Sequence, residues 1–211
     1  MSSKFESLSG RTDLDFPAYE STVGIKPLGL AQSWLNEAQA YGVREPRAMV
    51  LATVNAAGQL SSRVMAILEC NDEGIVFATH DDSRKIRDVA EAGGACGHFY
   101  WRELGRQLSV SGTVRALPRE LAEAAWQLRP IPLHSMSTVS RQSAPLLDPA
   151  ALRAADQAAA KKGALPCPAS FAVYMLEPQA LEFWAASPHR LHRRLRFERQ
   201  GTAWSYQRLQ P

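Results

Sequence analysis

The sequence has few cysteines and none in a paired motif. Cys70, Cys96 and Cys167 stand far apart, and no Cys-x-x-Cys pair occurs. Their odd number and wide spacing argue against a disulfide framework and against a cysteine zinc site, and free thiols are typical of a reducing cytosol. The five histidines likewise show no metal-ligand spacing with carboxylates. We therefore expect no metal site.

Long apolar runs and blocks of like charge are also missing. No segment is long and apolar enough to span a membrane, and no charged-then-apolar leader follows Met1. The formal net charge is only +3, and no run of Lys and Arg forms a separate basic tail. These absences predict a cytoplasmic protein that binds neither a membrane nor nucleic acid.

The common signatures of hydrolases and nucleotide-binding enzymes are absent too. The chain holds no Gly-x-Ser-x-Gly elbow and no glycine-rich phosphate loop. Nucleophilic hydrolysis therefore has no credible triad, and chemistry must be sought elsewhere.

The composition fits one globular domain with a short arm in front of it. Of 211 residues, 45% are apolar, so the chain can bury a sizeable core without a disulfide or a metal. Residues 1–27 are polar and turn-rich without periodicity, and we expect an arm that lies over the rest. Residues 28–211 should form a single domain, because the C-terminal strands are too few for a core of their own.

Hydrophobic periodicity predicts a mainly β chain with a few helices. The expected helices span residues 28–42, 83–92, 118–128 and 148–163. The expected strands span residues 48–54, 60–68, 75–79, 95–101, 107–117, 170–177, 180–185, 189–199 and 202–209. Hairpin-sized connectors leave little room for crossover helices, so the strands should pair antiparallel. The fold class expected is mainly β (α+β), a small barrel with peripheral helices.

Cations gather at one predicted helix start. Ser83-Arg84-Lys85 opens a helix, whose first N–H groups and dipole favour an anion. Arg63 stands in the middle of a predicted strand, where a cation needs a partner. Because Arg can bind a phosphate with two hydrogen bonds and Lys acts as a point charge, these residues are candidates for holding one. The alternative is an ordinary N-cap followed by solvated basic residues.

The segment from His189 to Phe197 alternates basic and apolar side chains. A strand would place Arg190, His192, Arg194 and Arg196 on one face and Leu191, Leu195 and Phe197 on the other. Such a row of cations is suited to a negatively charged partner. A solvated edge strand, with Arg chosen for solubility, is the plainer interpretation.

Neutral polar groups and one tryptophan complete the candidates. Gln107 heads an apolar strand, and Gln142 and Ser143 follow Arg141 in a loop. Such groups can bind the edge of a heterocycle, or they can simply make local hydrogen bonds. Trp184 is either a core residue or a flat wall for an aromatic ligand.

Together these motifs resemble the pyridoxamine phosphate oxidase family of FMN enzymes. The resemblance runs from about Glu45 to Pro211 and implies an FMN-binding split barrel of the antiparallel Greek-key type, and a homodimer with two FMN sites at the subunit interface. It rests on motifs in the family's order: Glu45-Pro46-Arg47-Ala48-Met49, Arg63 with its strand, Thr79 followed by Ser83-Arg84-Lys85, Arg106-Gln107, Arg129-Pro130, Ser140-Arg141-Gln142-Ser143, Glu182-Phe183-Trp184, and His189-Arg190-Leu191-His192 with Arg194.

The resemblance also implies roles for single residues. The FMN phosphate would be held by Arg63, Arg84, Lys85 and the Thr79 hydroxyl, and the ring by Gln107, Trp184 and Arg194. Val64, Met65, Ala66 and Ala78 would complete the cofactor site, with Gln142 and Ser143 supplied by the partner subunit. Arg190 and His192 would be the catalytic pair, and both would bind substrate together with Arg129.

The departures from the family's pattern indicate a different substrate. The family holds its substrate's phosphate with a lysine, a tyrosine, an arginine and a serine. By alignment these fall at Leu68, Ala125, Arg129 and Leu133, so only the arginine survives. Aliphatic surface with Arg129, Arg190 and His192 is suited to a flat, hydrophobic, polycyclic carboxylate.

One branch of the family has such a substrate. The runs Phe5-Glu6-Ser7-Leu8-Ser9-Gly10 and Gly42-Val43-Arg44-Glu45-Pro46-Arg47 look like the flavin oxidase of phenazine biosynthesis. That resemblance implies oxidation of a reduced phenazine dicarboxylate, with dioxygen as the final acceptor. Two alternatives remain open: an oxidase of pyridoxamine or pyridoxine phosphate, and a split-barrel protein that binds flavin or haem without turnover.

Overall fold

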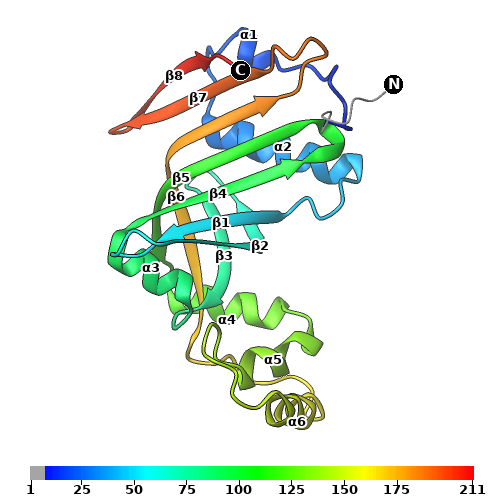
Figure 1. The fold of residues 1–211 in the computed structure, drawn as a ribbon, viewed down its shortest axis with the longest axis vertical. Coiled ribbons are helices and arrows are strands. Elements are labelled where there is room, and N and C mark those ends of the chain that lie inside the picture. Colours follow the sequence, from blue (N-terminus) through cyan, green and yellow to red (C-terminus); the bar gives the residue numbers. More distant parts are fainter. Residues whose placement is uncertain (1–7) are drawn as a thin grey trace.

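The computed structural model describes residues 8–211 as one eight-stranded sheet with helices at its edges and ends (Figure 1). The strands are β1 (Ala48–Val54), β2 (Leu60–Cys70), β3 (Ile75–His80), β4 (Gly94–Trp101), β5 (Arg106–Ala116), β6 (Phe171–Ala185), β7 (Arg193–Gln200) and β8 (Ala203–Leu209). The helices are α1 (Pro17–Glu20), α2 (Pro27–Tyr41), α3 (Arg84–Ala92), α4 (Arg119–Leu128), α5 (His134–Val139) and α6 (Pro149–Ala160), with 3-10 turns η1 (Arg102–Leu104) and η2 (Ile131–Leu133). Among these helices, none is long and apolar enough to cross a membrane.

The first six strands close into a barrel. The sheet order is β3-β2-β1-β4-β5-β6-β7-β8, and an additional pairing of β3 with β6 joins the two ends of the first six. Neighbouring strands pair antiparallel throughout, as the short connectors predict. β1 lies between β2 and β4 in the sheet. The connection from β3 to β4, which contains α3, therefore passes over β2 and β1. This is the Greek-key arrangement that the resemblance implied.

Strand β6 connects the barrel to the extension made by β7 and β8. It has 15 residues, of which the stretch from Tyr174 to Ala185 pairs with β5 along one edge, while the other edge pairs first with β3 and then with β7. The prediction of two strands, 170–177 and 180–185, was wrong because β5 pairs with β6 on both sides of Pro178. Pro178 has no N–H to donate, and it lies where the open edge changes partner and the register with Gly112 shifts.

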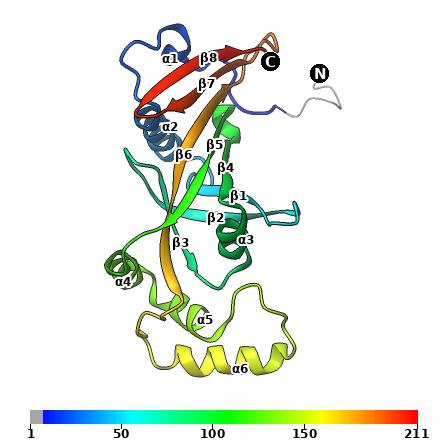
Figure 2. The same cartoon turned by 90° about the vertical axis from the view of Figure 1, so that its left-hand side faces the viewer.

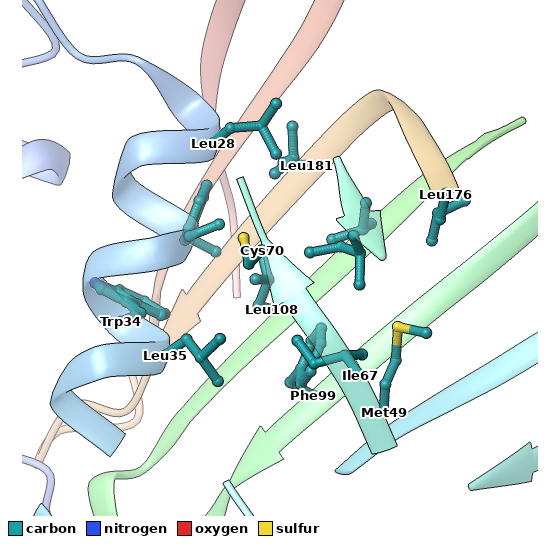
Figure 3. Close-up of a cluster of buried hydrophobic side chains, with 14 of the residues drawn as sticks. Leu28, Trp34, Leu35, Met49, Ile67, Cys70, Phe99, Leu108, Leu176 and Leu181 are labelled. Carbon is teal, nitrogen blue, oxygen red and sulfur yellow. The ribbon is translucent and has the colours of Figure 1, made fainter. Parts of the chain in front are cut away.

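Helix α2 covers one side of the sheet and completes the core. Leu28, Trp34 and Leu35 of this helix are buried and lie against strand residues such as Leu108 and Leu181 (Figure 3). The spacing of its apolar residues predicted this helix, and Gly42 ends it in the left-handed conformation that favours glycine.

The segment before α2 is fastened to the core by a buried cation. Arg106 is only 4% exposed, and its guanidinium pairs with Glu37, donates to the Asp15 carbonyl at 2.9 Å and lies 4.5 Å from the Trp34 ring centre. Phe16 joins the same core. The division into an arm, 1–27, and a domain, 28–211, stays a prediction, although α2 already begins at Pro27.

The strand expected over residues 189–199 begins later than predicted. β7 starts at Arg193, and residues 187–192 form a turn in which the Arg190 N–H donates to the Ser187 carbonyl. Arg190 has a φ of 60°, outside the extended region, and Leu191 is 71% exposed rather than buried. The alternation of faces therefore holds for Arg194 and Arg196 but not for Arg190 and His192.

The close approach of β5 to β6 generates a stability prediction. A Cβ on Gly112 would lie 1.9 Å from the Glu177 carbonyl oxygen, which is backbone and cannot move away easily. Gly112→Ala should therefore lower the free energy of unfolding by about 1–3 kcal/mol, measured by urea denaturation. Gly94→Ala is the control, because a Cβ there meets no atom within 4 Å. Equal stability of the two variants would contradict this account of the close approach of Gly112 to Glu177.

Candidate active site

A cavity of about 360 Å³ opens between β2, β3, α3 and α5. An adjoining hollow of about 340 Å³ shares Arg63, Lys85 and Gln142 with it and adds Arg84 and Ser143. These two spaces bring most of the expected cofactor residues together. The predicted residues that line the first cavity are Arg63, Val64, Met65, Ala66, Ala78, Thr79, Lys85, Arg129 and Gln142.

Lys85 is a buried cation with neutral partners. It lies in the first turn of α3, is 5% exposed, and its Nζ donates to Thr79 Oγ1 at 2.9 Å and to Gln142 Oε1 at 2.7 Å. No carboxylate of the described residues lies within ion-pair distance of it. Burial, with a smaller contribution from Arg63, lowers the pKa of Lys85 from 10.5 to about 8. A buried ammonium is costly unless an anion compensates it.

Arg63 is held in place by two hydroxyl groups that bind a buried carboxylate. Its guanidinium donates to Thr53 Oγ1 at 2.9 Å and to Ser61 Oγ at 2.5 Å. Both hydroxyls in turn donate to Asp88 Oδ2. Burial would raise the pKa of Asp88, but these hydrogen bonds, with Arg84 and Arg63 nearby, outweigh it and leave that pKa lowered. Asp88 therefore stays ionised and orients Arg63 through the hydroxyls.

The start of α3 also points toward this hollow. The Arg84 N–H donates to Ser143 Oγ at 3.2 Å. Ser83 occupies the N-cap position but its side chain makes no capping bond, in contrast to the alternative of an ordinary N-cap, and its buried Oγ has no hydrogen-bond partner among the described residues. An unpartnered hydroxyl at the N-terminus of a helix is an arrangement in which a phosphate oxygen could be bound.

Gln142 and Ser143 reach this site from the same chain. The expectation that the partner subunit supplies them is corrected, since Gln142 Oε1 accepts hydrogen bonds from both Lys85 and Thr79. The turn after α5 brings them there, and Ser143 has a left-handed φ of 69°. Such a conformation is rare for a non-glycine residue and is often kept at functional positions.

The charges of this hollow fit a phosphate ester. Arg63, Arg84 and Lys85 face it, and Asp88 offsets one of the three charges. A dianion would therefore find a net positive site with hydroxyl and N–H donors around it. The phosphate of FMN, which the resemblance implied, is compatible with these donors.

The other expected cofactor residues lie elsewhere in the fold. Gln107 of β5 pairs with Trp184 of β6, which pairs with Arg194 of β7, so the three form a row across the sheet. His192 packs on Trp184, with ring centres 4.7 Å apart, and its Nδ1 accepts from the Ser187 N–H at 3.2 Å. With Arg190 on the adjoining turn, this row forms a second cluster.

The second cluster is distant from the Phe171 end of the first cavity within one chain. Phe171 lines the first cavity, and Trp184 lies thirteen residues later on the same strand, which corresponds to about 40 Å of extended backbone. Figure 2 shows β7 and β8 at one end of the long axis and α4, α5 and α6 at the other. Neither cavity above includes a residue of the second cluster.

A larger apolar cavity of about 740 Å³ adjoins the first one. Leu68, Ala125, Arg129 and Leu133, the four positions that the family uses for the substrate phosphate, all line it. Arg129 lies at the junction, since it lines both cavities. It donates to Ser137 Oγ at 3.0 Å, its Nε has no partner among the described residues, and burial lowers its pKa. The junction thus combines one cation with an aliphatic wall.

Some residues of the site were not predicted from the sequence. Asp88, Thr53 and Ser61 orient Arg63, and Ser137 binds Arg129. The spacing of Arg84 and Asp88, one helical turn apart, was a signal that could have found Asp88. The other three are brought in by strand pairing and by α5, which the sequence reading missed. Among residues 8–211, no group of His, Cys, Asp and Glu could hold a metal ion.

Comparison with known proteins gives full-length relatives. Residues 35–155 match the family Pyridoxamine 5′-phosphate oxidase, and residues 171–211 match the Pyridoxine 5′-phosphate oxidase C-terminal dimerisation region. The chain is 46% identical to Dihydrophenazinedicarboxylate synthase of Burkholderia lata over 99% of both chains. It is 42% identical to the enzyme of the same name from Pseudomonas chlororaphis, over 98% of this chain and 93% of that one.

A solved structure agrees with these relatives. PhzG from Burkholderia lata, in complex with tetrahydrophenazine-1-carboxylic acid, superposes with a TM-score of 0.92 and 44% identity, covering 96% of this chain and 100% of that one. Pyridoxine/pyridoxamine 5′-phosphate oxidase of Leptospira biflexa is more distant, at 33% identity over 91% of this chain and 92% of that one.

The lowered pKa of Lys85 generates a prediction for binding. A phosphate dianion favours the ammonium form, so the affinity for a phosphate ester such as FMN should be constant below pH 8 and fall by up to about tenfold per pH unit above it. The FMN phosphate stays dianionic in this range. Flavin fluorescence titrations between pH 7 and 9.5 measure the effect.

Lys85→Met is the matched control for this titration. It should weaken FMN binding about 10- to 100-fold and remove the dependence above pH 8. The thermal stability of its ligand-free form should not fall, because the variant removes a buried cation that lacks an anion. A wild-type affinity that stays constant up to pH 9.5 would show that Lys85 does not bind the phosphate.

Proposed function

The chain belongs to the pyridoxamine 5′-phosphate oxidase family, and we propose that it is the FMN-dependent oxidase of phenazine biosynthesis, which oxidises a reduced phenazine dicarboxylate with dioxygen as acceptor. Its 46% identity over its whole length to Dihydrophenazinedicarboxylate synthase carries this conclusion. The PhzG structure, with its bound tetrahydrophenazine carboxylate, supports a tricyclic substrate.

The apolar cavity supports this substrate class from the physical side. Leu68, Ala125 and Leu133 cannot bind a phosphate, whereas Arg129 at the junction can bind one carboxylate. The volume of about 740 Å³ is within the range of sites for ring systems of this size. A pyridoxine phosphate substrate would leave its phosphate against aliphatic carbon, which is unfavourable.

We further propose that two copies of the chain share each FMN site. The match of residues 171–211 to a dimerisation region makes the chain one subunit of a dimer. Neither the first cavity nor the phosphate hollow includes a residue of the row of Gln107, Trp184 and Arg194, and Trp184 lies about 40 Å of extended backbone along β6 from Phe171 of the first cavity. A partner that brings its row to this chain's hollow would complete the site, and the symmetric pairing would complete a second one.

In this arrangement the residues of the chain bind, orient and transfer protons. FMN, when bound, supplies a hydride acceptor and returns the electrons to dioxygen, which leaves as hydrogen peroxide. Arg190 and Arg129 would hold the carboxylates of the tricycle in place. His192 would accept the proton that leaves with the hydride, and its position is fixed by Trp184 and by the Ser187 N–H. Removal of a hydride and a proton balances each two-electron oxidation.

A choice between two substrate classes tests the proposal. Oxygen uptake with a tetrahydrophenazine carboxylate should be fast, whereas kcat/KM for pyridoxamine phosphate should be at least about 100-fold lower, because several hydrogen bonds at about 1–3 kcal/mol each are missing. The triple variant Leu68→Lys, Ala125→Tyr, Leu133→Ser should gain activity on the phosphate substrate.

Normal turnover of pyridoxamine phosphate by the wild type would favour the alternative oxidase. A haem spectrum, or a flavin that the reduced tricycle does not bleach, would favour a binding protein without turnover.

The role of Arg190 gives a second test. Arg190→Ala should raise KM for the tricyclic carboxylate about 10- to 100-fold, because a charge-assisted hydrogen bond contributes about 1.5–3 kcal/mol. The FMN content, measured by absorbance, should stay unchanged. Arg199→Ala is a control, since that arginine pairs with Glu177 on β6 away from the turn. Unaltered substrate kinetics in the Arg190 variant would remove it from the site.

A further inference from the structure

Arg194 of the second cluster is held by a carboxylate that has no role in the proposal so far. Glu182 Oε1 accepts from Arg194 Nε at 2.9 Å and from Arg194 Nη2 at 2.7 Å. The Arg194 Nη1 donates to the Gln210 carbonyl at 3.0 Å. The Glu182 carboxylate thus fixes one edge of the guanidinium, and the Gln210 carbonyl fixes its remaining nitrogen.

Strand register places Glu182 on the same face of the sheet as Trp184 and Arg194. Trp184 lies opposite Arg194, and Glu182 lies opposite Arg196, so these four side chains share one face of β6 and β7. The Glu182 side chain is 19% exposed, and its Oε2 lies 3.6 Å from Arg196 Nη1. A half-buried carboxylate between two arginines orients both guanidinium groups and offsets part of their positive charge.

The contacts of the nearby charged groups distinguish Glu182 from Glu198, the other carboxylate beside Arg196. Glu198 pairs with Arg196 at 2.8 Å, whereas the ion pair of Arg194 among the described residues is with Glu182. On the opposite side of Glu182 lies Ser109, which binds His98 Nδ1 at 2.9 Å. Two carboxylates therefore contact Arg196, but Glu182 alone of the two contacts Arg194. This difference provides a matched pair of variants.

We propose that Glu182 is a positioning residue that holds Arg194 and offsets part of its charge, and that it thereby lowers the reduction potential of the bound flavin. The inference rests on the proposed function, because it requires the flavin ring to lie at Arg194. Electrons added to the ring bring negative charge, which a nearby guanidinium stabilises. A carboxylate paired with that guanidinium weakens the stabilisation, because it adds an opposing field at almost the same distance.

The test compares Glu182→Gln with Glu198→Gln in the FMN-loaded protein. The glutamine oxygen can still accept from Arg194, so Glu182→Gln removes charge and keeps the hydrogen bonds. It should raise the preference for reduced over oxidised FMN by about tenfold, which is a positive shift of about 30 mV for a two-electron couple. Glu198→Gln should change this preference by less than about twofold.

A second variant separates the position of Arg194 from its charge. Glu182→Ala should also raise the potential, and in addition it should weaken the binding of oxidised FMN, because Arg194 is no longer oriented. A merely structural role would lower the thermal stability of both Glu182 variants and leave their potentials at the wild-type value.

The outcomes distinguish the inference from the proposed function. A wild-type protein that binds no flavin refutes the proposed function, and the inference with it, before any variant is compared. If the wild type binds flavin, a larger positive shift in Glu182→Gln than in Glu198→Gln supports the inference. An equal, smaller or negative shift overturns it and leaves the proposed function intact.

Discussion

The two edges of strand β6 determine the organisation of this protein. One edge pairs with β5 from Tyr174 to Ala185, while the other closes the barrel through β3 and then leaves it to pair with β7. The same strand therefore carries Phe171, which lines the first cavity, and Trp184, in the row with Gln107 and Arg194. Because an extended chain cannot fold back within a strand, these two groups stay at opposite ends of it. This constraint separates the two groups within one copy, and the proposal that two copies share each FMN site rests on it.

The charges of the two partial sites are balanced differently, and the difference follows from their surroundings. At the start of α3, Lys85 is buried against neutral oxygens, and Asp88 reaches Arg63 only through hydroxyl groups. Such a hollow retains a net positive charge that a phosphate can use. At the end of β6, Arg194 already has Glu182 as a direct partner. A site that binds a phosphate is served by unpaired charge, whereas a site that adjusts the electronic state of a ring is served by a partly compensated charge.

The larger cavity is lined by aliphatic side chains at three positions where the family has polar ones. Leu68, Ala125 and Leu133 line one cavity with Arg129, although they come from β2, α4 and η2. Three aliphatic side chains favour a ring system through burial of its faces, and the remaining cation provides a single fixed point for a carboxylate. The apolar cavity can therefore enclose a ring system without leaving polar groups unpaired. The phosphate hollow, in contrast, needs an anion to compensate its buried charge.

The sequence by itself determined the local elements and the chemical character of the site. Periodicity predicted α2 and most strands, the helix start at Ser83 marked the phosphate hollow, and the short connectors predicted antiparallel pairing. It did not determine that β6 is one strand, that β7 begins only at Arg193, or that Gln142 binds Lys85 of its own chain. The roles of Asp88 and Glu182 also depended on contacts between elements. The physical reason is that capping and side-chain alternation act over a few neighbouring residues, whereas strand edges, ion pairs and cavities join residues that are distant in the chain.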